Sequence, residues 1–205
     1  MMRQGLAQLI NHEPDLVVSA EANNAAEAMA QLRGGKLDLA LLDISLPDKN
    51  GLELIKDIRA LLPELPLLVV SMHDEGIYAE RVLRAGGRGY IMKQEGGKRL
   101  MLAIRQILAG QIYVSENMSA KILEIFSGRR ADAAKTLPEL LTDRELEVFH
   151  LIGQGVATRD IAKRLHLSIK TVEVHRAHIK QKLKLNSATE LVHQAIRWVE
   201  SGNPQ

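Results

Sequence analysis

Apolar positions in the first half of the chain follow two different spacings. Helical spacing over residues 3–12, 24–33, 52–62, 76–85 and 97–109 predicts amphipathic helices. Between them lie short apolar runs at residues 16–20, 39–44, 65–71 and 89–92, which are typical of strands. The run at 39–44 is apolar almost throughout, as expected of a strand buried on both faces. This alternation predicts a parallel sheet covered by helices, a doubly wound α/β domain.

The second half of the chain has only helical spacing, and each helix begins at a recognisable capping residue. The expected caps are Thr142 with Glu145, Thr158, Ser168, and Ser187 with Glu190. Two of the helices are short and joined by a tight turn, and the second of these is strongly basic. This arrangement predicts a helix-turn-helix within a small all-α domain.

The division of the chain follows from these patterns. We expect a first domain over residues 1–110, a connecting helix and linker over 111–136, and a second domain over 137–205. Residues 127–136 are small and polar with no periodic apolar face, which is typical of a linker. The length of 205 residues accommodates two small domains.

Composition excludes several classes of function. The chain has no cysteine, which excludes disulfides, thiolate zinc sites and cysteine catalysis and fits a cytoplasmic protein. No apolar run approaches the roughly 18 residues that a membrane span requires, so we expect no membrane association. Aromatic residues make up only 3%, which disfavours a stacking platform for single-stranded nucleic acid.

The net charge of +2 conceals an uneven distribution. Residues 158–184 hold 8 Lys and Arg against 2 Asp and Glu, whereas residues 1–157 hold 18 against 21. Such a basic stripe is the footprint of a polyanion-binding surface. A solvated helix face is the alternative that charge alone leaves open.

Three polar residues follow three of the predicted strands: Asp43, Ser71 and Lys93. In a doubly wound sheet, sites form at the carboxyl ends of the strands. A carboxylate nucleophile, a hydroxyl and an ammonium group at one edge suit phosphoryl transfer. Taken singly, an Asp after a strand is more often a turn or cap residue, so the prediction depends on all three positions.

The surrounding residues resemble the receiver domain of response regulators. The carrying segments are residues 41–53 (LLDISLPDKNGLE), 69–73 (VVSMH) and 86–93 (GGRGYIMK). The resemblance implies a flavodoxin-like fold, with Asp43 as the phosphorylated aspartate, Ser71 as the switch hydroxyl, Tyr90 as the rotating aromatic and Lys93 as the lysine of the site. It also implies a sensor histidine kinase as partner and Mg²⁺ as cofactor.

One part of the receiver pattern is not found. Receivers begin with a buried strand that ends in an acidic pair, and this pair holds Mg²⁺. Here residues 2–6 resemble the first helix, which leaves Asp43 as the only retained ligand candidate. Two interpretations stay open: Met1 is an internal methionine of a longer protein, or the receiver is truncated and pairs strands differently, for example between chains. The second predicts weak or absent phosphorylation of Asp43.

The C-terminal half resembles the LuxR-type helix-turn-helix of the NarL/FixJ family over residues 137–200. The carrying segments are 141–148 (LTDRELEV), 161–162 and 167–175 (LSIKTVEVH). The resemblance places the motif between Thr158 and Ala177 and implies double-stranded DNA as partner and a homodimer. The residues expected at the DNA are Thr158, Arg159, Lys163, Lys170, Thr171, Glu173, Val174, Arg176, Ala177, Lys180 and Lys182.

Glu173 is the acidic exception in this set. It either accepts a hydrogen bond from a cytosine amino group or stabilises the positive end of its own helix. Val172, Ile179 and Leu183 recur at helical spacing and are expected to point inward.

These patterns predict a transcriptional response regulator whose receiver, phosphorylated on Asp43, controls dimerisation and DNA binding. A DNA-binding regulator that works without phosphorylation is the alternative. A stand-alone phosphotransferase or hydrolase is disfavoured because Gly-rich phosphate loops and Gly-x-Ser-x-Gly motifs are not found. A protein-binding adaptor is a further candidate, and duplex binding would distinguish it.

Overall fold

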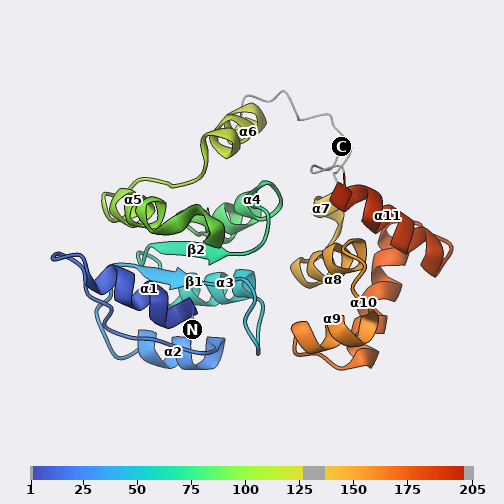
Figure 1. Ribbon diagram of the computed structural model, residues 1–205, viewed down its shortest axis with the longest axis horizontal. Coiled ribbons are helices and arrows are strands. Elements are labelled where there is room, and N and C mark those ends of the chain that lie inside the picture. Colours follow the sequence, from blue (N-terminus) through green and yellow to red (C-terminus); the bar gives the residue numbers. More distant parts are fainter. Residues whose placement is uncertain (1, 127–136, 201–205) are drawn as a thin grey trace. The chain divides into compact units, whose positions relative to one another are not determined.

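The computed structural model describes residues 2–126 and 137–200, and the expected linker at 127–136 lies outside them. The chain divides into two compact units, residues 1–120 and 121–205 (Figure 1). The first is an α/β unit and the second is helical, which confirms the predicted fold class.

Three short parallel strands form the sheet of the first unit. They are β1 (Ala40–Leu42), β2 (Leu67–Ser71) and β3 (Gly89–Met92), in the order β1-β2-β3. Leu41 lies opposite Leu68, and Val70 lies opposite Ile91. The helices of this unit are α1 (Met2–Asn11), α2 (Ala25–Leu32), α3 (Gly51–Leu61), α4 (Glu75–Ala85) and α5 (Gly96–Leu108), with the 3₁₀ turn η1 (Lys93–Glu95). Helix α6 (Glu116–Phe126) begins in this unit and ends in the second.

Helices cover both faces of this sheet because successive strand residues point to opposite sides. On one face, Leu68, Val70 and Ile91 form a buried cluster with α5 residues such as Ile104. On the other, Leu67 and Val69 are buried with the inner positions of α3, and α3 in turn packs on α4. Since both faces are covered, the strands are apolar almost throughout, as the sequence suggested.

The prediction of a strand over residues 16–20 is wrong. These residues have no regular secondary structure and pair with no strand in the described part of the chain. Their backbone bonds are local: Leu16 N–H donates to the Glu13 carbonyl at 3.3 Å, and Val18 N–H donates to Asn11 Oδ1 at 2.7 Å. A strand requires a neighbouring strand, and the local apolar pattern carries no information on whether one is present.

The segment that follows α5 returns to the sheet. Tyr113 forms a parallel bridge with Gly89 at the outer edge of β3, where Tyr90 N–H donates to the Tyr113 carbonyl at 2.9 Å. Two residues on, Ser115 N–H donates to Glu75 Oε1 at 2.7 Å. The start of α6 is therefore attached both to β3 and to the start of α4.

Besides the end of α6, the described part of the second unit holds five helices: α7 (Leu137–Leu140), α8 (Asp143–Gly153), α9 (Thr158–Arg164), α10 (Ile169–Lys182) and α11 (Ala188–Glu200). Fully buried residues from four of them form its core, namely Leu146, Phe149, Ile161, Val172, Ile179 and Leu191. Gly153 lies against α11 so closely that a Cβ there would meet the Ala195 carbonyl oxygen at 2.3 Å. The packing of α8 against α11 therefore depends on a residue without a side chain.

Most of the expected helix caps are present. Thr142 and Glu145 form a reciprocal capping box, Ser168 accepts from Thr171 N–H, and Ser187 Oγ accepts from Glu190 N–H. Thr158 is not a cap: Ala157 precedes α9 in the capping position, and Thr158 is the first residue of the helix itself. Among the described residues, no helix is both long and apolar enough to cross a membrane.

The loop between β1 and α3 leaves no room for a side chain at Gly51. A Cβ there would lie 2.2 Å from the Asp43 carbonyl oxygen and 2.7 Å from the Ile44 Cα. We expect Gly51→Ala to lower the free energy of unfolding of the first unit by about 1–3 kcal/mol, since backbone must shift to accept the methyl group. Gly35→Ala is the matched control, because a Cβ at Gly35 meets nothing within 4 Å.

Urea denaturation of the full-length variants, followed by circular dichroism, measures this difference. Equal midpoints for the two variants would show that the loop does not need glycine.

Candidate functional site

An ion pair joins the ends of the two outer strands. Lys93 Nζ lies 2.6 Å from Asp43 Oδ2, with the two side chains 14% and 29% exposed. Asp43 directly follows β1 and Lys93 directly follows β3, so the pair spans the end of β2. Ser71, the last residue of β2, is completely buried. The structure therefore brings the three predicted residues to one edge of the sheet.

Tyr90 lies under this edge with its ring fully buried. Its hydroxyl donates to the His73 carbonyl at 2.8 Å, and His73 N–H donates to Ser71 Oγ at 3.2 Å. Burial raises the pKa of Tyr90 well above its usual value, and the contact with the Ser71 hydroxyl offsets only part of this. Tyr90 is therefore a neutral hydrogen-bond donor at any physiological pH.

Two residues next to Asp43 were not predicted from the sequence. Ser45 N–H donates to Asp43 Oδ1 at 3.3 Å, and Ser45 Oγ lies 2.9 Å from His73 Nε2. The His73 ring also packs against Tyr78, with centroids 4.7 Å apart. Only their positions in the sequence could have pointed to them: Ser45 lies two residues after Asp43, and His73 lies two residues after Ser71.

Asp48 connects the same loop to α2. Its carboxylate accepts from the backbone N–H groups of Ala25 and Ala26 at 2.9 and 3.0 Å. Partial burial raises the pKa of Asp48, but these backbone hydrogen bonds outweigh that effect and the pKa is lowered overall. An anion at a helix N-terminus is stabilised by the unpaired N–H groups there. Asp48 thereby attaches α2 to the loop that carries Asp43.

The described residues at this edge offer a magnesium ion a single carboxylate, that of Asp43. Mg²⁺ in proteins is usually held by one or two carboxylates together with water and substrate oxygens. Asp43 is already paired with Lys93, and among the described residues no three His, Asp or Glu side chains are grouped so as to hold a metal.

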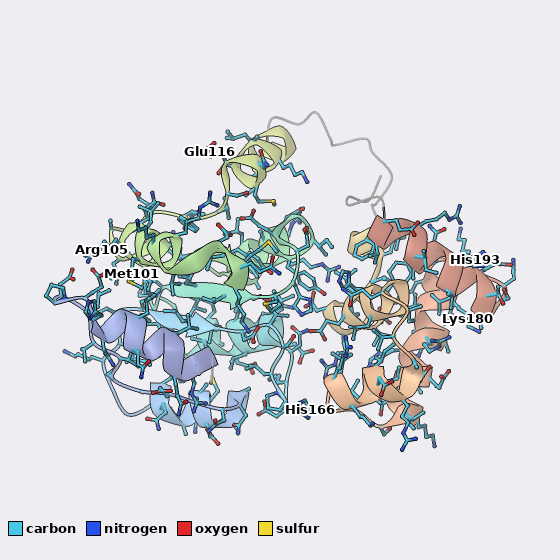
Figure 2. All side chains as sticks on the ribbon, in the orientation of Figure 1. Met101, Arg105, Glu116, His166, Lys180 and His193 are labelled. Carbon is cyan, nitrogen blue, oxygen red and sulfur yellow. The ribbon has the colours of Figure 1, made fainter. Side chains whose placement is uncertain are left out.

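The second unit contains a helix-turn-helix formed by α9 and α10. In the turn between them, His166 has a φ of +53°, and Ser168 then begins α10. Figure 2 shows His166 in this turn and Lys180 on α10. Val172 and Ile179 are fully buried, as predicted, so the opposite side of α10 is directed to solvent.

The residues predicted to contact DNA divide by exposure. The exposed ones are Arg159, Lys163, Lys170, Glu173, Val174, Ala177 and Lys182, and the half-buried ones are Thr158, Thr171, Arg176 and Lys180. Val174 is 45% exposed although it is aliphatic, and Ile169 at the start of the helix is 52% exposed. The solvent-facing side of α10 thus presents both cations and apolar groups.

Three of the predicted cations also have partners inside the unit. Lys163 Nζ lies 3.7 Å from Asp160 Oδ1, and both of these side chains are exposed. The Arg176 side chain is only 17% exposed; its Nη1 lies 3.4 Å from Thr158 Oγ1 and its Nε lies 3.6 Å from Glu173 Oε2. Lys182 Nζ lies 2.6 Å from Glu145 Oε2. Arg176 thus attaches α10 to the start of α9 and also binds within α10, and Lys182 attaches α10 to α8.

The partner of Lys182, Glu145, is a buried acid. Its side chain is 4% exposed and accepts hydrogen bonds from Lys182 Nζ and Thr142 N–H. Burial raises the pKa of Glu145, but these bonds outweigh burial and hold the pKa below its usual value. His175 lies nearby, and burial lowers its pKa.

A doubly wound unit with an Asp–Lys pair at the strand ends, joined to a helix-turn-helix, defines a two-part regulatory protein. Residues 1–105 match the response regulator receiver domain, and residues 139–195 match the luxR family of bacterial regulatory proteins. The chain therefore belongs to the response regulators that combine a receiver with a LuxR-type helix-turn-helix, which are regulators and not enzymes.

Curated and solved relatives support this assignment. The chain is 36% identical over 201 residues to the oxygen regulatory protein NreC of Staphylococcus aureus, covering 96% of this chain and 93% of that protein. A LuxR-family response regulator from Aurantimonas is 32% identical, with a TM-score of 0.57 over 62% of this chain and 90% of that one. RcsB of Salmonella enterica, bound to the promoter rprA with the phosphomimetic BeF₃⁻, is 25% identical, with a TM-score of 0.58 over 93% and 90% of the two chains.

Removal of the Lys182 ammonium group tests its contact with Glu145. We expect Lys182→Met to lower the free energy of unfolding of the second unit by about 1–2 kcal/mol near neutral pH, because a buried carboxylate loses its cation while Lys182 itself is partly screened by solvent. The pKa of Glu145 is lowered in the folded state, so its stabilisation is present above the unfolded pKa and is lost as the pH falls through the folded value.

The difference between Lys182→Met and the wild type should therefore shrink in acid, as measured by urea denaturation at a series of pH values. Lys180→Met is the control, since it removes a cation from the same helix without breaking an ion pair seen in the described residues. A difference that does not change with pH would exclude the Glu145 contact as its cause.

Proposed function

We propose that this protein is a DNA-binding transcriptional regulator of a two-component system, in which Asp43 accepts a phosphoryl group from a sensor histidine kinase. The single observation that carries the phosphorylation part of this proposal is the 2.6 Å ion pair between Lys93 and Asp43. The pair lies at the end of β2, the strand that finishes with the buried Ser71. Phosphorylation would favour a dimeric form that is competent for DNA binding.

Each residue at the site has a role in this proposal. The Asp43 carboxylate is the nucleophile. Lys93 neutralises charge that develops on the phosphoryl oxygens, and the Ser71 hydroxyl donates a hydrogen bond to one of them. Ser71 Oγ accepts the hydrogen bond from His73 N–H through a lone pair, so the Ser71 O–H can donate to the phosphoryl group at the same time. The buried Tyr90 hydroxyl is the neighbouring group that would respond.

The exposed side of α10 is the proposed DNA-reading surface. Lys170 lies at its N-terminal end beside the aliphatic Ile169, and Val174 follows one turn later. In the major groove, cations bind phosphates and guanine, while aliphatic groups contact the thymine methyl group. Arg159 and Lys163 of α9 would contact the backbone. Arg176 and Lys182 contribute mainly by holding α10 in place.

The relatives support both halves of the proposal. RcsB was solved as two dimers bound to two parallel DNAs, and it also binds promoters in the presence of a phosphomimetic. At 25% identity over 93% of the chain, this protein would use DNA and a second copy as partners in a comparable way.

One observation favours a second candidate, a regulator that binds DNA without phosphorylation. The described residues offer Asp43 alone at the strand ends and contain no acidic cluster that could hold a cation. A carboxylate that attacks a phosphoryl group needs a cation to offset charge repulsion, and Lys93 would have to supply it alone.

Treatment of the full-length chain with a small phosphodonor separates these candidates. We expect one phosphate on Asp43, none on Asp43→Asn, and a rate roughly 100-fold lower for Lys93→Met, because the ammonium group stabilises developing charge. Mass spectrometry of the intact protein, with and without Mg²⁺, measures the uptake. Asp38→Asn, which changes an exposed carboxylate of the preceding loop, is the control.

Two results together would establish the regulator that binds DNA without phosphorylation. The chain would stay unmodified under all these conditions, and Asp43→Asn would leave its DNA affinity unchanged.

Salt dependence of DNA affinity tests the α10 surface. We expect Lys170→Ala to weaken binding of the full-length chain to duplexes selected from a random pool and to reduce the slope of log affinity against log salt by about 1. Lys98→Ala, on α5 of the receiver, should leave both unchanged. Glu173→Gln should alter the base preference at one position by about 1–3 kcal/mol if Glu173 contacts cytosine.

An unchanged base preference would instead assign Glu173 to the start of α10 and to its partner Arg176. A wild-type chain that binds these duplexes no better than an unrelated basic protein would contradict the proposed function.

A further inference from the structure

Glu173 lies just beyond the first turn of α10, where it is poorly placed to stabilise the positive end of that helix. α10 begins at Ile169, its first turn contains no acidic residue, and Ser168 already accepts a hydrogen bond from Thr171 N–H. The interaction of a side-chain charge with the helix dipole falls off within the first turn. The start of α10 therefore does not account for a carboxylate at this position.

Glu173 does lie on the surface that is proposed to meet DNA. Its side chain is 56% exposed, and Val174, the next residue, is 45% exposed. An unpaired carboxylate there would be repelled by the DNA phosphates that the neighbouring cations attract. Among the described residues, Glu173 forms one ion pair, in which its Oε2 lies 3.6 Å from Nε of Arg176, almost one turn later.

Arg176 is held on its other side by the preceding helix. Its Nη1 lies 3.4 Å from Oγ1 of Thr158, the first residue of α9, and its side chain is only 17% exposed. A guanidinium group carries five N–H donors in a fixed plane, so it can contact two partners in a defined geometry. Arg176 therefore limits the directions open to the Glu173 carboxylate, which an ion pair between two mobile surface side chains would not do.

A carboxylate held in one direction in the major groove distinguishes the bases by their donors. Cytosine presents an amino donor there, whereas guanine and thymine present acceptor oxygens that repel a carboxylate. Adenine presents an amino donor next to its N7 acceptor, so it offers a carboxylate a mixed environment. A fixed Glu173 carboxylate would therefore favour cytosine over the other three bases.

We infer that Arg176 is a positioning residue for base recognition, which connects α9 to Glu173 and directs the Glu173 carboxylate toward the amino group of one cytosine. This inference rests on the proposed function, because it requires that α10 enter the major groove. The ion pair already exists in the free protein, so the carboxylate loses little conformational freedom when DNA binds. Arg176 thus contributes to the choice of sequence as well as to the position of α10.

A double-mutant cycle on the full-length chain tests this inference. Duplexes are selected from a random pool, and the Kd is then measured for the selected duplex and for its single-base variants. We expect the wild type to prefer cytosine at one position by about 10-fold. Glu173→Ala and Arg176→Met should each remove most of this preference. The double variant should lose no more of it than Glu173→Ala alone, because both changes remove the same contact.

Two further variants separate positioning from charge and from folding. Lys180→Met, at a position labelled in Figure 2, removes a cation of α10 that takes part in no ion pair of the described residues. It should weaken binding to all the duplexes alike and leave the cytosine preference unchanged. Thr158→Val keeps the shape of its side chain and removes the hydroxyl next to Arg176, so it should lower the preference by about 3-fold.

Circular dichroism establishes which variants are folded. If Arg176→Met does not fold, Thr158→Val decides the question, and an unchanged cytosine preference in that variant would overturn the inference.

Three other results would overturn the inference while the proposed function stands. They are a wild-type chain that selects DNA sequences without a cytosine preference that depends on Glu173, a cytosine preference that survives Arg176→Met, and an effect of Arg176→Met that is equally large in the Glu173→Ala background. The last result would mean that Arg176 contacts DNA itself. A wild-type chain that binds duplexes no better than an unrelated basic protein would instead contradict the proposed function.

Discussion

Parallel pairing of β1, β2 and β3 is the constraint on which the first unit depends. Parallel strands end at the same edge, so the residues that follow them are brought together although they lie 28 and 22 positions apart in the chain. Because strand side chains alternate between faces, a slip of one residue would turn Ser71 or Tyr90 to the opposite side. The short contact between Asp43 and Lys93 is therefore a consequence of register, and it also fixes the two outer strands relative to each other.

The same register connects the site to the segment that leads out of the receiver. Tyr90 donates through its hydroxyl to His73 and through its backbone N–H to Tyr113. Glu75, at the start of α4, binds Ser115 just before α6. A rearrangement of Ser71 and Tyr90 would thus act on groups that are bonded to the start of α6. Since α4, β3 and this segment share hydrogen bonds, they are expected to respond together.

The sequence predicts the features that depend on local residue pattern, which are the helices, their caps and most of the strands. It does not predict features that depend on a residue far away in the chain. The helices, most of their caps and the strands after which Asp43, Ser71 and Lys93 occur are set by spacing and capping residues, and they were predicted. Residues 16–20 have the composition of a strand, but strand formation needs a neighbour that composition does not reveal. Helix α7 was missed because four residues carry too little periodicity. The contacts of Asp48 with α2 and of Lys182 with Glu145 join residues 23 and 37 positions apart, and no local signal marks such pairs.

The basic segment shows why charge counted along a sequence overstates the charge available to DNA. Lys182 and Arg176 belong to the stripe at residues 158–184, yet each has an acidic partner within its own unit. Glu145 is buried and must be neutralised, so Lys182 is required for folding before it can serve in binding. Lys163 of α9 is also paired, with Asp160 at 3.7 Å. The cations of α9 and α10 that take part in no ion pair of the described residues lie on both helices: Arg159 and Arg164 on α9, and Lys170 and Lys180 on α10. Of these, Lys170 lies at the end of a recognition helix that enters the major groove first. Folding thus commits part of the charge of the stripe to contacts within the unit, and the charge that is left for DNA is smaller than the count along the sequence.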